Sequence, residues 1–165
     1  MTYQPFDIGT KFRIAPVGYS PSGDRIDLVM QRGAFGSGEH QTTRSCLELM
    51  EHLADLEAAE VLDLGSGTGI LAIAALKLGA SHAVCVDIEA QAVETAMANC
   101  ALNHLERRTT HMTGTLAEVF QTGFDVILAN IYGDILIDLA GSLSGKLKQG
   151  GALLLSGILW EYNFD

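Results

Sequence analysis

The chain has 165 residues, a formal net charge of −10 and 48% hydrophobic residues. This length suits one domain with a sizeable core, the apolar content argues against disorder, and no apolar run reaches the roughly 18 residues of a membrane span. The acidic balance argues against direct nucleic-acid binding, which depends on neutralising phosphates, and it would suit a basic protein partner.

Residues 1–32 carry the pattern of short strands and turns. Residues 11–14 and 25–30 alternate polar and apolar side chains, which predicts two strands, and the stretch from Pro16 to Gly23 predicts turns. A self-contained recognition domain would need more chain than this. We therefore expect residues 1–32 to form a β arm, or a hairpin that leads into a larger domain over residues 33–165.

A glycine-rich loop over residues 33–43 encloses one large aromatic residue, Phe35. A helix is expected after it, with apolar residues spaced for one buried face: Leu47, Met50 and Leu53. Thr42 or Thr43 could cap this helix. The loop is either an ordinary surface connection or a lid that folds the Phe35 ring over a ligand.

The most informative stretch follows that helix. Residues 61–64 predict a buried strand, and residues 70–78 predict a helix with Gly79 at its C-cap. Three glycines at alternate positions join the two: Gly65, Gly67 and Gly69. Strand, glycine turn and helix form the ligand-binding corner of a doubly wound α/β fold, where ligands sit at the carboxyl ends of strands.

The glycine spacing narrows the choice of ligand. A dinucleotide motif has glycine or alanine at its sixth position, where this chain has Ile70, whose branched side chain would impede the close helix packing. The phosphate-loop pattern ending in Gly-Lys-Ser/Thr is absent, because Lys77 comes too late. A turn that needs glycine only for its shape remains the alternative.

Residues 82–88 predict the next strand, with Asp87 near its carboxyl end. Asp87 lies 22 positions after Gly65 (87 − 65), and an acid about 20 residues past the first glycine can bind a ribose. One carboxylate has two acceptor oxygens, which match the two hydroxyls of the sugar. An aspartate that caps the following helix is the alternative interpretation.

Strands and helices continue to alternate after Asp87. The helix over residues 90–102 has four expected core residues on one face: Val93, Ala96, Met97 and Cys100. We expect Asn99 and Asn103 at the surface and at the C-cap, and Arg107–Arg108 in a solvated turn. The third strand is expected within residues 109–116.

Residues 124–131 are nearly all apolar and predict a central strand, with Asn130 as the polar residue at its carboxyl end. A helix over residues 134–147 follows, with apolar residues at helical spacing: Ile135, Leu136, Leu139 and Leu143. Gly150–Gly151 predicts a turn into a last strand over residues 152–159. A polar end on a central strand is common in α/β proteins, so Asn130 alone indicates no function.

Three cysteines, Cys46, Cys85 and Cys100, lie far apart in the sequence. An odd number at such distances fits buried thiols in a reduced protein better than a disulfide or zinc framework. The first residues lack the basic and apolar regions of a signal peptide. We therefore predict a cytoplasmic protein, and we predict no metal site.

Several motifs, in the right order, carry a family resemblance. Residues 63–69 have the spacing Asp-x-Gly-x-Gly-x-Gly, which resembles motif I of class I S-adenosylmethionine-dependent methyltransferases. Residues 33–43 closely resemble the loop before motif I in the PrmA family, which methylates the bacterial ribosomal stalk-base protein. Residues 129–131, Ala-Asn-Ile, and residues 155–159, Leu-Ser-Gly-Ile-Leu, are also similar to that family. The resemblance covers residues 6–161 and implies an α/β, doubly wound, Rossmann-like methyltransferase sheet.

The resemblance implies S-adenosylmethionine as the cofactor and assigns residues to it. Gly65 and Gly67 would line its methionine end through their backbone, and Asp87 would hold its ribose. Thr43, with Phe35 nearby, would close the loop over the bound cofactor.

The resemblance also implies N-methylation of protein amino groups, with a ribosomal protein as the candidate substrate. Asn130 would face the transferring methyl group, both as a cofactor contact and as the catalytic residue. Its amide oxygen could accept a hydrogen bond from the incoming amine and align it for in-line attack. No residue stands out as a base, so water or desolvation of the amine would have to suffice.

Two departures from the family pattern keep other interpretations open. The family carries a separate N-terminal domain that grips the ribosomal protein, and its fold continues after strand five. We therefore expect a sheet truncated after strand five in a domain over residues 33–165, with an exposed apolar edge suited to self-association. A small-molecule methyltransferase, or a non-catalytic cofactor-binding or interaction module, is the alternative.

Overall fold

The computed structural model describes residues 3–31 and 40–157. They form two sheets, with strands in the orders β1-β2-β3 and β6-β5-β4-β7-β8. The strands are β1 (Phe6–Ile8), β2 (Phe12–Ala15), β3 (Ile26–Val29), β4 (Glu60–Leu64), β5 (His82–Asp87), β6 (Thr109–Thr113), β7 (Phe124–Asn130) and β8 (Leu147–Ser156). The helices are α1 (His40–Met50), α2 (Ile70–Lys77), α3 (Ala90–Leu102) and α4 (Gly133–Lys146), with short 3-10 helices η1 (Ala54–Leu56), η2 (Glu106–Arg108) and η3 (Leu116–Glu118).

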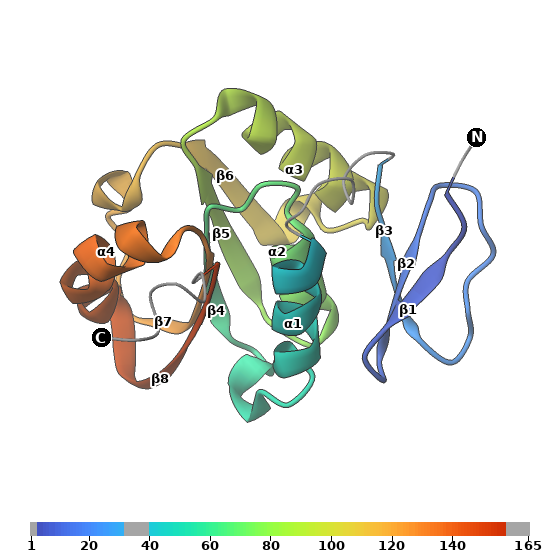
Figure 1. Ribbon diagram of the computed structural model, residues 1–165, viewed down its shortest axis with the longest axis horizontal. Coiled ribbons are helices and arrows are strands. Elements are labelled where there is room, and N and C mark those ends of the chain that lie inside the picture. Colours follow the sequence, from blue (N-terminus) through green and yellow to red (C-terminus); the bar gives the residue numbers. More distant parts are fainter. Residues whose placement is uncertain (1–2, 32–39, 158–165) are drawn as a thin grey trace.

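The larger sheet is parallel throughout. The chain runs outward from β4 through β5 to β6, then returns to pair β7 on the other side of β4. Figure 1 shows α1, α2 and α3 on one face of this sheet and α4 on the other. The predicted doubly wound α/β class is therefore confirmed. The strand order reverses at β4, which has β5 on one side and β7 on the other. Ligands bind at such a switch point, at the carboxyl ends of the strands.

Each central strand contributes side chains to two separate cores. In β4, Val61 packs with α1 and α2, whereas Leu62 and Leu64 pack with η3 and α4. Both faces are covered, so both need apolar residues. This explains why the strand sequences are almost continuously apolar instead of alternating.

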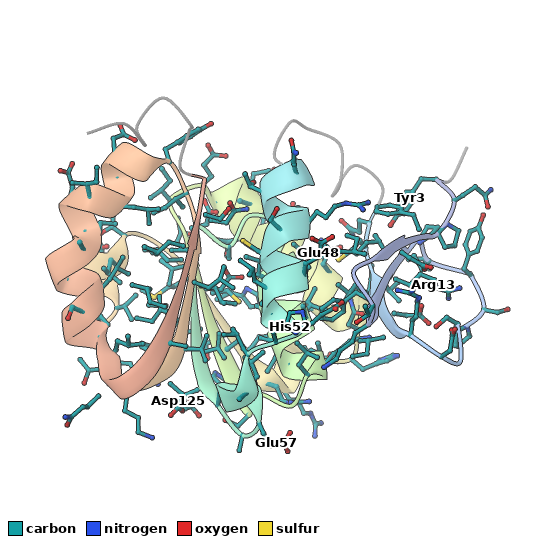
Figure 2. All side chains as sticks on the ribbon, turned by 60° about the horizontal axis from the view of Figure 1, so that its bottom comes forward. Tyr3, Arg13, Glu48, His52, Glu57 and Asp125 are labelled. Atoms are coloured by element: carbon teal, nitrogen blue, oxygen red, sulfur yellow. The ribbon has the colours of Figure 1, made fainter. Side chains whose placement is uncertain are left out.

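The N-terminal sheet shares one of these cores. β1 pairs antiparallel with β2, and β2 pairs parallel with β3. Five of its side chains are fully buried in the cluster that includes α1 and α2: Ile8, Phe12, Ile14, Leu28 and Met30. Figure 2 shows Arg13 on this sheet and Tyr3 in the segment before β1. The predicted strands at residues 11–14 and 25–30 are confirmed, β1 was not foreseen, and the domain boundary after residue 32 stays a prediction.

Several local expectations are wrong. Helix α1 already begins at His40, so Thr42 and Thr43 lie in its first turn and do not cap it. Met97 is 52% exposed, because the buried face of α3 is turned toward Ala96 and Cys100.

Arg108 does not lie in a solvated turn. Its guanidinium donates to the Leu76 carbonyl at 3.1 Å and also to the Ala80 carbonyl, at the C-terminal end of α2. A helix C-terminus has unsatisfied carbonyls that a cation can bind. Gly150 and Gly151 lie within β8, which starts at Leu147 directly after α4. The register against β7 shifts there, from Phe124–Leu147 to Val126–Ala152, and Gly150 has a φ of 78°, so the predicted turn is an irregularity inside the strand.

One edge strand of the large sheet is β8, which pairs with β7 alone among the described residues; β6 is the strand at the other edge. Leu153 and Leu155 on this strand are 39% and 37% exposed. In the part of the chain that the structure describes, no helix is both long and apolar enough to cross a membrane.

Candidate functional site

The glycine turn after β4 needs glycine for two different reasons. Gly65, Gly67 and Gly69 have φ values of 70°, 51° and 79°, which side chains with a Cβ rarely adopt. A Cβ at Gly65 would overlap Ile131, and one at Gly69 would lie 3.1 Å from the Ala96 Cβ. At Gly67 nothing lies nearer than the Gly65 carbonyl oxygen at 4.0 Å. Packing therefore requires the outer two glycines, and the middle one leaves room for a ligand.

Asp87 fastens this turn to the end of β5. Its Oδ2 accepts a hydrogen bond from the Gly67 N–H at 2.9 Å, and its Oδ1 accepts one from the Glu89 N–H at 3.0 Å. The Val86 carbonyl accepts from the first two amides of the turn at 2.8 and 3.0 Å. A carboxylate offers about four lone-pair positions, so two bonds leave capacity for a diol.

Asn130 and Thr43 come from distant parts of the chain and meet at the carboxyl ends of the strands. The Asn130 Nδ2 donates to the Thr43 Oγ1 at 3.2 Å. The backbone carbonyl oxygen of Asn130 lies 4.0 Å from where a Cβ would stand at Gly65, so Asn130 and Thr43 border the glycine turn. Because Thr43 engages the amide nitrogen, the amide oxygen is the end that can accept from another group.

Asp63 supports the turn from below. It is 1% exposed, and its Oδ2 accepts a hydrogen bond from the Ala72 N–H at 3.1 Å. This bond satisfies an amide of the first turn of α2, whose N-cap Gly69 has no side chain to do so. Burial raises the pKa of the Asp63 carboxyl from 3.8 to about 7.

The turn also carries a buried polar atom without a protein partner. The Ser66 Oγ makes no hydrogen bond among the described residues, although Ser66 is 7% exposed. Buried hydroxyl groups are usually bonded. Together with the open space at Gly67, this fits a turn whose polar atoms are completed by a ligand.

Asn99 is a site residue that sequence reasoning missed. It is fully buried, its Nδ2 donates to the Thr68 carbonyl in the glycine turn, and its Oδ1 accepts from the Gln31 N–H, both at 2.9 Å. The expected surface position is wrong because both ends of the amide are paired with backbone. A signal was present: Asn99, and Asn103 just after α3, continue the buried stripe that starts at Val93 and Ala96.

The structure thus brings together five of the six predicted site residues: Thr43, Gly65, Gly67, Asp87 and Asn130. Phe35 lies outside the described residues. Among residues 3–31 and 40–157, no group of three or more His, Cys, Asp or Glu could hold a metal ion.

A separate hollow lies at the opposite edge of the sheet, where Figure 2 labels Glu57 and Asp125. The Asp125 carboxylate is already engaged, because it accepts from the Glu60 N–H at 2.9 Å and pairs with Lys148 at 3.0 Å. These bonds lower the pKa of Asp125. Asp125 therefore serves to hold the amino ends of β4 and β7 together, and we assign no ligand to this hollow.

Comparison with known proteins places this geometry in a family. The family model described as ribosomal protein L11 methyltransferase (PrmA) matches residues 1–163. A curated ribosomal protein L11 methyltransferase from Pelobacter propionicus is 46% identical over 96% of this chain, which spans about half (53%) of that relative's length.

Solved structures agree in fold. The crystal structure of ribosomal protein L11 methylase from Lactobacillus delbrueckii subsp. bulgaricus superposes with a TM-score of 0.84 and 33% identity, over 94% of this chain and 81% of that one. The Trypanosoma brucei PRMT1 enzyme–prozyme complex with AdoHcy gives a TM-score of 0.61 and 26% identity, over 70% of this chain and 38% of that one. The chain belongs to the ribosomal protein L11 methyltransferase (PrmA) family.

Proposed function

We propose that the chain binds S-adenosylmethionine at the glycine turn and takes part in transferring a methyl group to protein amino groups. The observation that supports this most is the Asp87 carboxylate, which is bonded to Gly67 at 2.9 Å. One residue thereby fixes the turn and presents acceptor oxygens beside the open space at Gly67. A ribose diol and a backbone-lined methionine end match those two features.

When bound, S-adenosylmethionine supplies a sulfonium-activated methyl group. We assign the aiming of the acceptor to Asn130, whose amide oxygen accepts a hydrogen bond from the incoming amine and so directs the nitrogen lone pair. Thr43 holds that amide in place through the 3.2 Å bond to its Nδ2. Alignment of this kind contributes strongly to displacement reactions.

The incoming amine must be neutral to attack, and a lysine amine has a pKa of about 10.4. We propose that the proton leaves to water, either directly or because desolvation in the pocket favours the neutral amine, and we assign no described side chain as the base. The rate should then rise with pH, and a flat profile from about pH 6 to 10 would contradict this assignment.

For the substrate we propose a ribosomal protein, since the relatives are named as methyltransferases of ribosomal protein L11. Phe35 stays a predicted lid residue. For the compartment we propose the cytoplasm, because Cys46, Cys85 and Cys100 are all buried and free, as in reducing surroundings.

We further propose that the exposed edge at β8 can mediate self-association. Leu155 is partly exposed on this strand, and a charge there opposes edge-to-edge pairing. Light scattering should detect concentration-dependent association of the wild type and less of it in Leu155→Lys. An equal mass for both proteins at every concentration would contradict a role for this edge.

Calorimetric titration with S-adenosylhomocysteine tests the cofactor site. We expect micromolar affinity for the wild type, loss of binding in Asp87→Ala, and unchanged binding in the control Asp24→Ala, in the exposed bend before β3. A folded wild type that binds nothing would contradict the cofactor site itself.

Transfer of labelled methyl groups into ribosomal extract tests the acceptor. We expect label in a ribosomal protein, and little label with Asn130→Leu although that variant still binds S-adenosylhomocysteine. Label that appears only in low-mass compounds would refute the protein acceptor and favour a small-molecule methyltransferase.

A further inference from the structure

β3 pairs with β2 along one edge, and side chains from two helices bond to its other edge. The Lys77 Nζ donates to the Asp27 carbonyl at 2.6 Å. The Asn103 amide bonds Val29 twice, donating to its carbonyl at 2.7 Å and accepting from its N–H at 3.0 Å. Alternate residues of a strand direct their backbone groups to the same edge, so α2 and α3 replace a neighbouring strand here.

Asn99 continues this series and adds a second contact. Its Oδ1 accepts from the Gln31 N–H, two residues beyond Val29, and its Nδ2 donates to the Thr68 carbonyl. One amide therefore joins the end of the N-terminal sheet to the middle of the glycine turn. Asn99 is fully buried, so water cannot replace either bond.

This contact bonds a peptide of the turn that lies between two glycines. Thr68 lies between Gly67 and Gly69, both with positive φ, and glycines allow a peptide to rotate between several orientations. Asp87 fixes the Gly67 N–H on one side, and Asn99 fixes the Thr68 carbonyl on the other.

We propose that Asn99 is a positioning residue that couples the cofactor turn to the N-terminal sheet. It holds the turn in its binding conformation only while the Gln31 end of that sheet is docked on α3. Cofactor affinity thus depends on the docking of β3, and cofactor binding tightens that docking in return. This inference rests on the proposed cofactor site.

Four proteins test the coupling by titration with S-adenosylhomocysteine: the wild type, Asn99→Leu, Asn103→Leu and Asn99→Asp. Asn103 is the comparison residue: it lies one turn further along, at the C-cap of α3, bonds Val29 of β3 twice and does not touch the glycine turn. Its Nδ2 also donates to the Asn99 backbone carbonyl at 2.8 Å. We expect both leucine variants to lose thermal stability. Only Asn99→Leu should weaken binding, by about tenfold, because it leaves the Thr68 carbonyl unpaired. Equal losses of affinity in the two variants would reduce Asn99 to a structural role.

Asn99→Asp tests the coupling through the pH dependence of its affinity, which requires no comparison of stabilities. This variant can therefore decide whether Asn99 positions the turn even if Asn99→Leu does not fold. A protonated carboxyl can donate to the Thr68 carbonyl, whereas a carboxylate cannot. The affinity of this variant should therefore fall as the pH rises from about 5 to 9, relative to the wild type. A variant that follows the wild-type profile overturns the proposal.

Hydrogen exchange separates this inference from the cofactor assignment. In the free protein, the Gly69 N–H donates to the Ser66 carbonyl at 2.7 Å. Its exchange should be faster in Asn99→Leu than in Asn103→Leu, whether or not the wild type binds S-adenosylhomocysteine. Identical exchange at Gly69 in both variants would contradict the coupling itself.

Discussion

The Thr43 hydroxyl bonds the nitrogen end of the Asn130 amide. An asparagine amide can present either its oxygen or its nitrogen to a substrate, and the two ends have opposite hydrogen-bonding roles. The Nδ2–Oγ1 bond of 3.2 Å leaves the oxygen as the acceptor for a donor such as an amine. This contact joins a side chain of α1 to the amide at the end of β7.

Replacing Thr43 by valine keeps its shape and removes the hydroxyl. We expect the methyl-transfer kcat to fall about fivefold to tenfold, because one neutral hydrogen bond contributes about 1 kcal/mol. S-adenosylhomocysteine affinity, measured by calorimetry, should change less than about twofold if Thr43 acts through Asn130.

Thr43→Ser keeps the hydroxyl and should retain most of the activity. A loss of cofactor affinity in Thr43→Val, with kcat unchanged, would instead place Thr43 on the cofactor, as its family resemblance implies.

Asp63 makes the folded state sensitive to pH. Because its pKa rises from 3.8 to about 7 on folding through burial, the folded protein binds more protons than the unfolded chain between these values. The free energy of unfolding contributed by this group therefore falls as the pH rises from about 4 to 7 and is constant above that range.

Asp63→Asn should remove this pH dependence, since the amide oxygen can still accept from the Ala72 N–H. We compare the free energy of unfolding of the variant with that of the wild type at each pH. This difference should be more favourable to the variant at pH 8 than at pH 4.5, by on the order of 2–4 kcal/mol. Urea unfolding at the two pH values measures the difference, with the exposed Asp24→Asn as control. A variant that keeps the wild-type pH slope would show that Asp63 is not the responsible group.

Among the elements, α1 connects the N-terminal sheet with the site. Directly after its last residue, the Glu51 carboxylate accepts from the Thr10 N–H at 3.0 Å, the Thr10 hydroxyl at 2.8 Å and the Lys11 N–H at 2.8 Å. Glu51 is 8% exposed. Burial opposes its ionisation, but the bonds from Lys11 and Thr10 outweigh burial and lower its pKa. One end of α1 therefore holds the β1–β2 turn, and the other carries Thr43.

Glu51→Gln removes the charge and replaces one acceptor oxygen by a donor, so the part-buried bonds from Thr10 and Lys11 are weakened or lost. We expect a loss of about 1–3 kcal/mol in the free energy of unfolding at pH 7. The lowered pKa shows that the fold stabilises the ionised Glu51 carboxylate. The stability that Glu51 contributes is therefore present above its ordinary pKa of 4.5, and it is lost as the pH falls through the pKa of the folded state. The difference between variant and wild type should thus shrink below about pH 4.

Glu48 lies on the exposed side of the same helix, so Glu48→Gln is a matched control that should change stability by less than about 0.5 kcal/mol. Denaturant titrations of the three proteins provide the measurement. Equal destabilisation by both substitutions would argue for a general charge effect on α1 and against a specific clamp.

The whole molecule carries a formal charge of −10. If its substrate is a basic ribosomal protein, long-range attraction should speed the encounter. We expect kcat/KM for that protein to fall by about tenfold or more between low and high salt, because screening shortens the range of the attraction. The control is the affinity for S-adenosylhomocysteine, a zwitterion without net charge. This affinity, measured by calorimetry, should depend little on salt. A salt-independent kcat/KM would mean that recognition does not use the net charge.

Local sequence predicted the elements that depend on short-range rules. The glycine turn, the helix over residues 70–78 and Asp87 at the end of β5 follow from spacing and steric freedom, and the structure has them within a residue or two. The family resemblance added Asn130 and Thr43 as candidates, and their direct contact came only with the fold. Whether all of these residues act as assigned stays a prediction.

Residues that pair over long sequence distances were misjudged. Asn99 bonds Gln31, 68 positions away, and Arg108 bonds the end of α2. A polar side chain is predicted at the surface because burial without a partner costs free energy, and a single sequence does not reveal which backbone groups will supply the partner.

The doubly wound α/β class and the glycine turn after β4 follow from the sequence alone, because apolar runs and glycine positions act within a few residues. How that turn is held became apparent only from the tertiary structure. The backbone groups at Thr68 and at the edge of β3 needed partners, and close packing brought the Asn99 and Asn103 side chains to them. Hydrogen bonds require contact in space, and the order of residues along the chain does not specify that contact.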